Sequence, residues 1–456
     1  MKQIFTTLSL YFVLAAQAQT PTLSPVISAL SSPVTFAIAP DDGRFFIVHR
    51  SGLVRAFTSA GTLIGTFYDL TSSVTTAAYR GVLGIAFDPD YANNKFVYIF
   101  YENASPANHR IVRVTDVANV GTSPQIIFDE SVSTSNGYNV GGAIHFMPDD
   151  TSHLFIALGF GNIAGAGQTL NSPHGKYLRI YRNGTIPLDN PYYDDGNPAA
   201  GNDDRIWAYG FRNPFDFSFN PQNDSLYSVD LGATTWDEVN IVSRGLNYGW
   251  DICEGICGTA GMTNPIFEYS GNSALTGILF YHHTLLPQFD NHALVGNYNT
   301  GQILDLALGN APAYDTVLSQ TVASSVTSIT AIAQGNEGCI YMLKGGNTSS
   351  GTLYRFCIPL TGIENQQVDF ASEVEIFPNP ASNEFSISGI SAEEFSIHLF
   401  SMEGKNLGEV FSGENLSGEK ITVALNHLSG GIYFVKLEGK TGGSAFSSMK
   451  KLSVVR

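Results

Sequence analysis

One pattern of apolar and polar positions repeats along the first 358 residues. An alternating apolar segment runs into a turn such as Pro-Asp, a second apolar segment follows, and a third often ends in Gly-x-apolar-x-Arg. Copies begin at Phe36, Ile85 and His145, with weaker copies at Phe217, near Phe289 and at Ile332. Alternation with a period of two, interrupted by Asp, Asn, Gly and Pro, is typical of β-strands joined by turns.

The spacing of these copies predicts the fold of residues 22–358. The copies lie about 44 to 72 residues apart, which matches a four-stranded unit with variable loops. Six such units that close on themselves form a six-bladed β-propeller with a pocket at the mouth of its central channel. A pair of β-sandwiches is the alternative.

The pattern stops at residues 359–371, which we predict to be a linker. Residues 372–456 form a shorter unit with two clear alternating segments, one from Phe395 and one from Leu428, each next to a Gly turn. A small β-sandwich is the fold predicted for this unit. The fold class is therefore all-β, with a propeller followed by a small C-terminal sandwich.

The N-terminus has the features of an export signal over residues 1–18. Lys2 precedes an apolar run from Ile4 to Ala16, and Ala16-Gln17-Ala18 gives the small-x-small pattern that a signal peptidase accepts. The run is too short to span a membrane. A buried first strand or helix is the alternative. We expect an exported protein without a transmembrane segment.

Composition excludes two other classes of protein. The chain has 456 residues, with 23 basic and 40 acidic side chains and a net charge of −17, so the basic surface that nucleic-acid binding requires is missing. Its apolar fraction of 43 % and charged fraction of 14 % are not those of a disordered chain.

The four cysteines fit an oxidising compartment. Cys253 and Cys257 are close in sequence and could form half of a zinc site, but no second thiol or histidine pair lies at ligand spacing. Cys339 begins one strand-like segment and Cys357 ends the next, so a disulfide can close that hairpin. We predict two disulfides, Cys253–Cys257 and Cys339–Cys357.

The last 85 residues resemble a known targeting domain. Phe377-Pro-Asn-Pro, the Gly404-Lys405 turn, Gly430-Gly-Ile-Tyr-Phe-Val and the basic tail are similar to the C-terminal sorting domain of type IX secretion cargo. The resemblance implies the type IX secretion machinery as a partner, removal of the domain, and release or attachment at the cell surface. A carbohydrate-binding sandwich is the alternative.

The propeller region resembles the glucose/sorbosone dehydrogenase family. The resemblance rests on Arg80-Gly-Val-Leu-Gly-Ile-Ala-Phe-Asp-Pro-Asp, on Gly210-Phe-Arg-Asn-Pro, on Asp230-Leu-Gly-Ala-Thr-Thr-Trp-Asp-Glu and on Gly245-Leu-Asn-Tyr-Gly-Trp. These quinoproteins use pyrroloquinoline quinone (PQQ) and calcium. The resemblance implies oxidation of a sugar hydroxyl, with a small sugar or a polysaccharide as the ligand.

The resemblance also implies site residues. Arg212 matches the family arginine beside the quinone, and Asn213 accompanies it. Gly232 and Ala233 match positions whose backbone carbonyls bind the cofactor's calcium. The resemblance further implies a structural calcium site at Glu238, by its carboxylate, and Tyr248, by its carbonyl.

Two positions depart from the family pattern. Asn139 stands where the family has its catalytic histidine, and an amide cannot accept a proton at ordinary pH. Phe160 replaces the aspartate that orients that histidine. Between residues 251 and 358, only Lys344 and Arg355 are available as cations for the cofactor carboxylates. A non-catalytic propeller that binds carbohydrate or protein is therefore the alternative function.

Other side chains are weaker candidates. His145 lies in a predicted strand and faces either the core or the channel, whereas His174, His282 and His283 fit ordinary packed or surface positions. Four aspartates fall in a Gly/Asn/Pro-rich loop that is either a calcium site or a solvated loop: Asp194, Asp195, Asp203 and Asp204.

Overall fold

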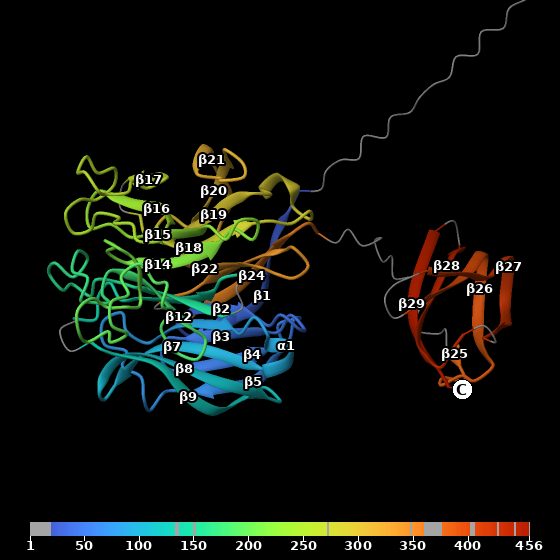
Figure 1. The fold of residues 1–456 in the computed structure, drawn as a ribbon. Helices are drawn as coiled ribbons and strands as arrows, with labels where there is room; N and C mark the ends of the chain where they lie inside the picture. Colours follow the sequence, from blue (N-terminus) through green and yellow to red (C-terminus); the bar gives the residue numbers. More distant parts are fainter. Residues whose placement is uncertain are drawn as a thin grey trace, which may run out of the picture. The chain divides into compact units, whose positions relative to one another are not determined.

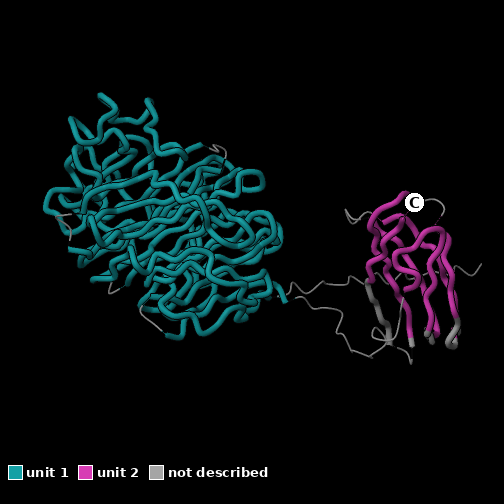
Figure 2. Tube along the Cα trace, turned by 90° about the horizontal axis from the view of Figure 1, so that it is seen from below, with its two compact units in different colours: residues 1–359 teal, residues 360–456 magenta. Residues whose placement is uncertain are grey.

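The structure is a computed structural model that describes residues 20–132, 136–148, 152–270, 273–346, 349–359, 376–401, 406–425, 428–441 and 444–455. The predicted signal peptide and most of the predicted linker lie outside these residues. The chain divides into two compact units, residues 1–359 and 360–456, coloured separately in Figure 2. Among the described residues, no helix is long and apolar enough to cross a membrane.

The first unit consists of six antiparallel four-stranded sheets (Figure 1). In chain order they are β2–β5 (Pro33–Ile38, Phe45–His49, Leu53–Phe57, Leu63–Asp69), β6–β9 (Val82–Phe87, Phe96–Ala104, Ala107–Val117, Val120–Ser131), β10–β13 (Gly141–Phe146, His153–Leu158, Lys176–Tyr181, Ile206–Tyr209), β14–β17 (Pro214–Phe219, Leu226–Asp230, Trp236–Val242, Phe267–Ser270), β18–β21 (Leu275–Tyr281, His292–Asn297, Gln302–Gly309, Thr316–Ser325), and β22–β24 (Ile329–Gln334, Ile340–Lys344, Gly351–Cys357) with β1 (Thr22–Leu30). Helical structure is limited to α1 (Tyr91–Asn94) and the 3₁₀ turn η1 (Pro287–Phe289) among the described residues. The prediction of an all-β chain is confirmed.

The six sheets close into a ring. The first strand of each sheet contacts the first strand of the next, in the order β2, β6, β10, β14, β18 and β22, and β22 contacts β2 again. The N-terminal β1 pairs with β24, so the last sheet is completed by the start of the chain. The fifth copy begins at Leu275 rather than near Phe289, because Phe289 lies in η1 between the first two strands of that sheet.

The hydrophobic core lies between neighbouring sheets. All five residues of β3 are buried, and they alternate between two clusters: Phe45 and Ile47 pack against the last sheet, whereas Phe46 and Val48 pack against the second. This is the expected consequence of a period of two in a strand that is covered on both faces. Since the apolar contacts lie between sheets, the ring axis can carry polar residues.

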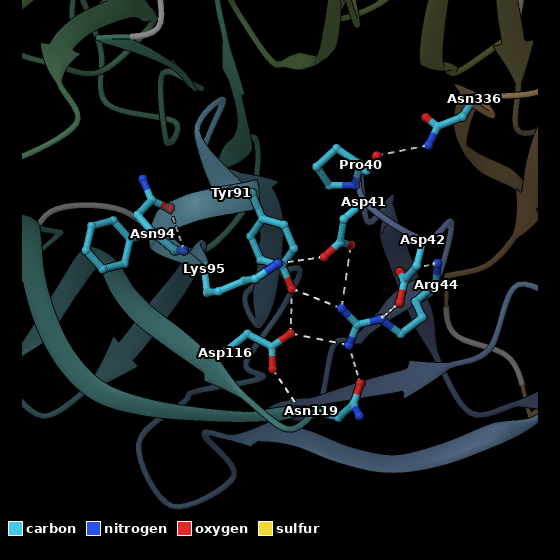
Figure 3. A network of polar contacts seen from close by, with 11 residues as sticks. Pro40, Asp41, Asp42, Arg44, Tyr91, Asn94, Lys95, Asp116, Asn119 and Asn336 are labelled. Atoms are coloured by element: carbon cyan, nitrogen blue, oxygen red, sulfur yellow. Dashed lines mark hydrogen bonds and ion pairs between the residues drawn. The ribbon is translucent and has the colours of Figure 1, made fainter. Parts of the chain in front are cut away.

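A polar network joins the first sheet to both of its neighbours (Figure 3). The Arg44 guanidinium donates to the Tyr91 hydroxyl at 3.1 Å and forms an ion pair with Asp116 at 3.3 Å, both in the second sheet region. The Asn336 side-chain amide donates to the Pro40 carbonyl at 3.2 Å from the last sheet. The network lies in the turns of the sheets and has a structural role.

The second unit contains one five-stranded sheet made of β25 (Ile376–Phe377), β26 (Glu384–Ser401), β27 (Asn406–Ala424), β28 (Gly431–Thr441) and β29 (Ser444–Val454). The long β26 pairs with β25, β27 and β28, and its alternate residues Phe385, Ile387 and Ile397 are buried in a core of their own. The two-sheet sandwich stays a prediction.

Candidate functional site

A cavity of about 500 Å³ runs along the axis of the ring. First strands of all six sheets contribute to its wall, as shown by Thr35, Gly84, His145, Asp216, Thr276 and Thr330. One end is formed by loops that carry most of the residues predicted from sequence, among them Asn139, Arg212, Asn213 and Gly232. Tertiary structure thus brings these four positions to one cavity.

Arg212 and Asn213 are fixed in front of β14 by Asp230. Their backbone N–H groups donate to the two oxygens of the buried Asp230 carboxylate at 2.9 and 2.6 Å. The Arg212 guanidinium donates to the Leu231 carbonyl at 3.0 Å and lies over the Trp250 ring, and its buried Nε has no hydrogen-bond partner among the described residues. Burial lowers the pKa of Arg212.

Asn139 lines this end of the cavity, and Phe160 lies next to it but outside the cavity lining. The Asn139 carbonyl accepts the Gly161 N–H at 3.1 Å, and its side-chain amide donates to the Asn162 side chain at 2.5 Å. The Phe160 ring packs edge-on against Trp250, at 5.3 Å between centroids. The two residues that depart from the family pattern are therefore neighbours. Asn139 is held by amide contacts and Phe160 by an aromatic contact, and neither side chain can accept a proton.

A single carboxylate oxygen organises the loop after β15. Glu254 Oε1 accepts the backbone N–H groups of four consecutive residues, 233 to 236, at distances of 2.9 to 3.2 Å. A Cβ on Gly232 would come within 1.9 Å of the Trp236 carbonyl oxygen, so this turn requires glycine. Burial raises the pKa of Glu254, but these four N–H groups lower it below its ordinary value.

Glu238 belongs to a row of acidic side chains across three strands. Asp230 pairs in register with Glu238, and Glu238 pairs with Glu268. Glu238 is buried and accepts the Gly255 N–H at 2.6 Å and the Asn240 amide at 3.0 Å. Burial raises the pKa of Asp230 and of Glu238, and the charge of Glu238 adds to the effect on Asp230. Neither carboxylate forms an ion pair among the described residues.

Tyr248 is buried in the same region. Its hydroxyl donates to the Ile241 carbonyl at 2.5 Å and accepts the Ser243 N–H at 2.8 Å. The ring stacks on Phe211, at 4.7 Å between centroids. The side chain thus has a packing role, and only its backbone carbonyl is left for a metal.

His145 faces the cavity rather than the core. Its Nε2 lies 3.0 Å from the Asp216 carboxylate, and its side chain is 43 % exposed against 15 % for Asp216. His145 is four residues further along β10 than Gly141, which is on the order of 10 Å deeper in the channel. This pair lies beside a strand irregularity in β10 and another in β14, which sequence patterns do not reveal.

Neither of the two cations that the sequence offers for an anionic cofactor lies at the cavity. Lys344 and Arg355 do not line the cavity, and Arg355 instead lies 3.8 Å from Glu337. Arg50 does line it, and its guanidinium donates to the Ala78 carbonyl at 2.6 Å. Arg50 and Arg212 are therefore the two arginines of the described cavity wall.

Both disulfides are present in the structure. Cys253 bonds to Cys257, and Cys339 bonds to Cys357 between adjacent ends of β23 and β24. The first disulfide closes a short loop that contains Glu254 and Gly255. Glu254 accepts the N–H groups of residues 233–236, and Gly255 donates its N–H to Glu238. The loop therefore supports the wall of the cavity from outside.

Lys176 was not singled out from the sequence, although it is fully buried beside the site. Its ammonium donates to the carbonyls of Ala166, Gly167 and His174 at 2.6 to 2.9 Å. Burial lowers the pKa of Lys176 to about 7. A lysine in an apolar strand segment is the signal that could have revealed this position, since a buried lysine requires partners.

Comparisons with known proteins match two families along the chain. The family described as Glucose / Sorbosone dehydrogenase matches residues 30–355, and the family described as Secretion system C-terminal sorting domain matches residues 375–454. Aldose sugar dehydrogenase YliI from Escherichia coli (strain K12) is 26 % identical over 344 residues, which cover 72 % of this chain and 90 % of that protein.

Solved structures show the same fold. The soluble aldose sugar dehydrogenase of Escherichia coli in its apo-form matches with a TM-score of 0.65 and 24 % identity, covering 74 % of this chain and 100 % of that one. The PQQ-bound form of aldose sugar dehydrogenase from Streptomyces coelicolor matches with a TM-score of 0.63 and 20 % identity, covering 75 % and 100 %. At these identities the likeness concerns the fold.

Proposed function

We propose, from the premise that the chain belongs to the glucose/sorbosone dehydrogenase family, that it is a sugar dehydrogenase that uses PQQ and calcium on a six-bladed propeller. The observation that carries the proposal is the cavity on the ring axis, where Arg212, Asn213 and Gly232 meet. The C-terminal sorting domain shows that the protein is exported and is secreted or attached at the cell surface.

The polar groups at the cavity suit both PQQ and calcium. Arg50 and the free Nε of Arg212 would hold cofactor carboxylates, and the backbone carbonyl of Gly232 would hold its calcium together with that of Ala233, which follows Gly232 but does not itself line the cavity. Asp230 and Glu238 are buried acidic side chains on the adjacent strands β15 and β16, and the charge of Arg212 attracts Asp230. When bound, PQQ supplies a two-electron acceptor and calcium supplies a Lewis acid.

Oxidation of a sugar hydroxyl requires a side chain that accepts the hydroxyl proton. Asn139 hydrogen-bonds to Asn162 and cannot take a proton from a sugar hydroxyl. His145 is the one imidazole of the described cavity wall, and Asp216 orients it. A substrate hydroxyl must enter deeper into the channel to reach His145 than to reach residue 139. We therefore assign His145 as the base only for a substrate whose reacting end fits into that deeper part of the channel.

The direct test is PQQ binding and dye-linked sugar oxidation by the full exported chain with calcium. We expect Asn139→His with Phe160→Asp to raise turnover on an aldose panel by about 100-fold or more, because it returns a general base with its orienting carboxylate. PQQ affinity should stay within a few-fold of the native value. Absence of PQQ binding in both proteins would refute the proposed function, and native turnover abolished by His145→Ala would assign the base to His145.

A non-catalytic carbohydrate-binding propeller is the second candidate. Tyr79 and Tyr138 stand edge-on at the cavity, 5.2 Å between centroids, and remain 60 % and 46 % exposed. Exposed aromatic rings at the rim of a polar pocket suit stacking on a sugar face. Sugar binding that is lost in Tyr138→Ala, in a protein that binds no PQQ, would favour this candidate.

Calcium should stabilise the native chain through Glu238. Saturating calcium, at about 100 times its Kd, adds about 2.7 kcal/mol to the free energy of unfolding at one site. We expect the resulting rise in Tm to be reduced in Glu238→Gln, measured by calorimetry with calcium and with EDTA. Asn240→Ala provides the control, because it removes a hydrogen bond to Glu238 without removing the charge. An equal calcium response in Glu238→Gln would rule Glu238 out as a ligand.

A further inference from the structure

A second group of carboxylates lies outside the cavity, in the loop between β12 and β13. One oxygen from each of Asp194, Asp195 and Asp204 lies within 4.8 Å of the other two. Asp194 and Asp195 are exposed, whereas Asp204 is fully buried. The three side chains come from both ends of an 11-residue stretch, so the fold of the loop brings them together.

No basic side chain neutralises this group among the described residues. Two neighbouring arginines pair with other carboxylates of the same loop: Arg205 forms an ion pair with Asp203 at 2.7 Å, and Arg179 forms one with Asp189 at 2.5 Å. Three carboxylates held this close repel one another unless a cation lies between them. The loop therefore concentrates negative charge that its own arginines leave uncompensated.

Asp204 gives the independent observation that a ligand is missing. Its Oδ1 accepts the Asp194 N–H at 2.5 Å, but its Oδ2 is buried and has no hydrogen-bond partner among the described residues. A buried carboxylate oxygen without a donor is rare in folded proteins, because the oxygen has lost water and gained nothing in exchange. This oxygen belongs to the carboxylate that the other two aspartates approach.

The adjacent Asp203 shows what a satisfied buried aspartate looks like in the same loop. Both of its oxygens accept from the Arg205 guanidinium, at 2.8 and 2.7 Å. Asp203 and Asp204 are equally buried and are neighbours in sequence, yet only Asp203 has a cationic partner. The four loop aspartates, which form one group in the sequence, divide in the structure into three that converge and one that is paired with Arg205.

We propose that Asp194, Asp195 and Asp204 form a calcium site that fixes the loop between β12 and β13, separate from the axial cavity. Three carboxylates and no histidine or thiol favour a hard cation, and an irregular loop suits the flexible coordination of Ca²⁺ better than the strict octahedron of Mg²⁺. Export places this site where calcium is abundant, so an affinity in the range of extracellular calcium modules, about 10⁻⁴ to 10⁻³ M, is sufficient.

The test uses the full chain in a Glu238→Gln background, which removes the proposed contribution of Glu238 to calcium binding. Calcium binding is measured by calorimetric titration, and Tm is measured with calcium and with EDTA. Asp195→Asn should raise the Kd of this site at least 10-fold and abolish its share of the calcium-dependent rise in Tm. Asp189→Asn is the matched control, since it removes one exposed charge from the same loop outside the group, and it should leave the calcium Kd within two-fold.

Variants at the two buried neighbours give a second contrast. Asp204→Asn should abolish calcium binding at this site while raising Tm in EDTA, because it removes an uncompensated buried charge. Asp203→Asn should lower Tm both with and without calcium, because it weakens the pairing of Arg205. A Glu238→Gln protein that binds no calcium, or an Asp195→Asn protein with unchanged calcium affinity, would overturn the proposal.

Discussion

Glu254→Ala should unfold at a markedly lower denaturant concentration than the native chain. One oxygen of Glu254 accepts four consecutive N–H groups, from residues 233 to 236, and among the described residues no other side chain accepts from these groups. Hydrogen bonds to a charged acceptor contribute about 1.5 to 3 kcal/mol each, but this loop is partly exposed and water can replace some of them. We expect a loss of about 2 to 4 kcal/mol, measured by urea unfolding.

The same substitution should weaken calcium and PQQ binding at the cavity. Gly232 lines the cavity and lies at the start of the turn that Glu254 holds, so its carbonyl direction depends on that turn. We expect PQQ affinity to fall at least 10-fold, measured by titration of the folded fraction. Glu268→Ala is the matched control, since Glu268 accepts the N–H of Ile256 in the neighbouring Cys253–Cys257 loop and none from residues 233–236 among the described hydrogen bonds. Equal effects of the two substitutions would contradict a positioning role for Glu254.

Lys176→Met should destabilise the chain by about 3 kcal/mol. Methionine fills nearly the same volume, but the carbonyls of Ala166, Gly167 and His174 would lose their shared donor inside the protein. Leaving a buried acceptor without a partner costs about 1 to 3 kcal/mol per group, and removal of the buried ammonium charge offsets part of the sum. The free energy of unfolding from urea titration measures the difference.

An exposed lysine provides the control for Lys176→Met. Lys95 forms a surface ion pair with Asp41 at 2.7 Å, and such pairs contribute about 0 to 1 kcal/mol. Lys95→Met should therefore change the free energy of unfolding by less than 1 kcal/mol. A loss of stability in Lys176→Met as small as that in Lys95→Met would mean that water replaces the ammonium as the donor to the three carbonyls. Lys176 would then not be the residue that fixes residues 166–174.

Much of the fold follows from local patterns. A period of two in segments such as Phe45–His49 predicts strands, and turn residues between the segments predict antiparallel pairing. The Cys339–Cys357 pair follows from the hairpin that the pattern predicts. The adjacency of Arg212 and Asn213 is read from the sequence, whereas their backbone N–H groups are held by Asp230, which the tertiary structure brings to them.

The tertiary structure decided the contacts between segments that are far apart in the chain. The sequence contains Glu254, Lys176 and the β1 segment, but no periodicity indicates that Glu254 holds residues 233–236 or that β1 completes the last sheet. The sequence also cannot distinguish Asp203 from Asp204, because the two differ in their partners in the folded chain: Asp203 pairs with Arg205 and Asp204 does not. Alternation specifies which face of a strand is buried, whereas partners across sheets depend on ring closure and on loop paths that are set by the whole chain.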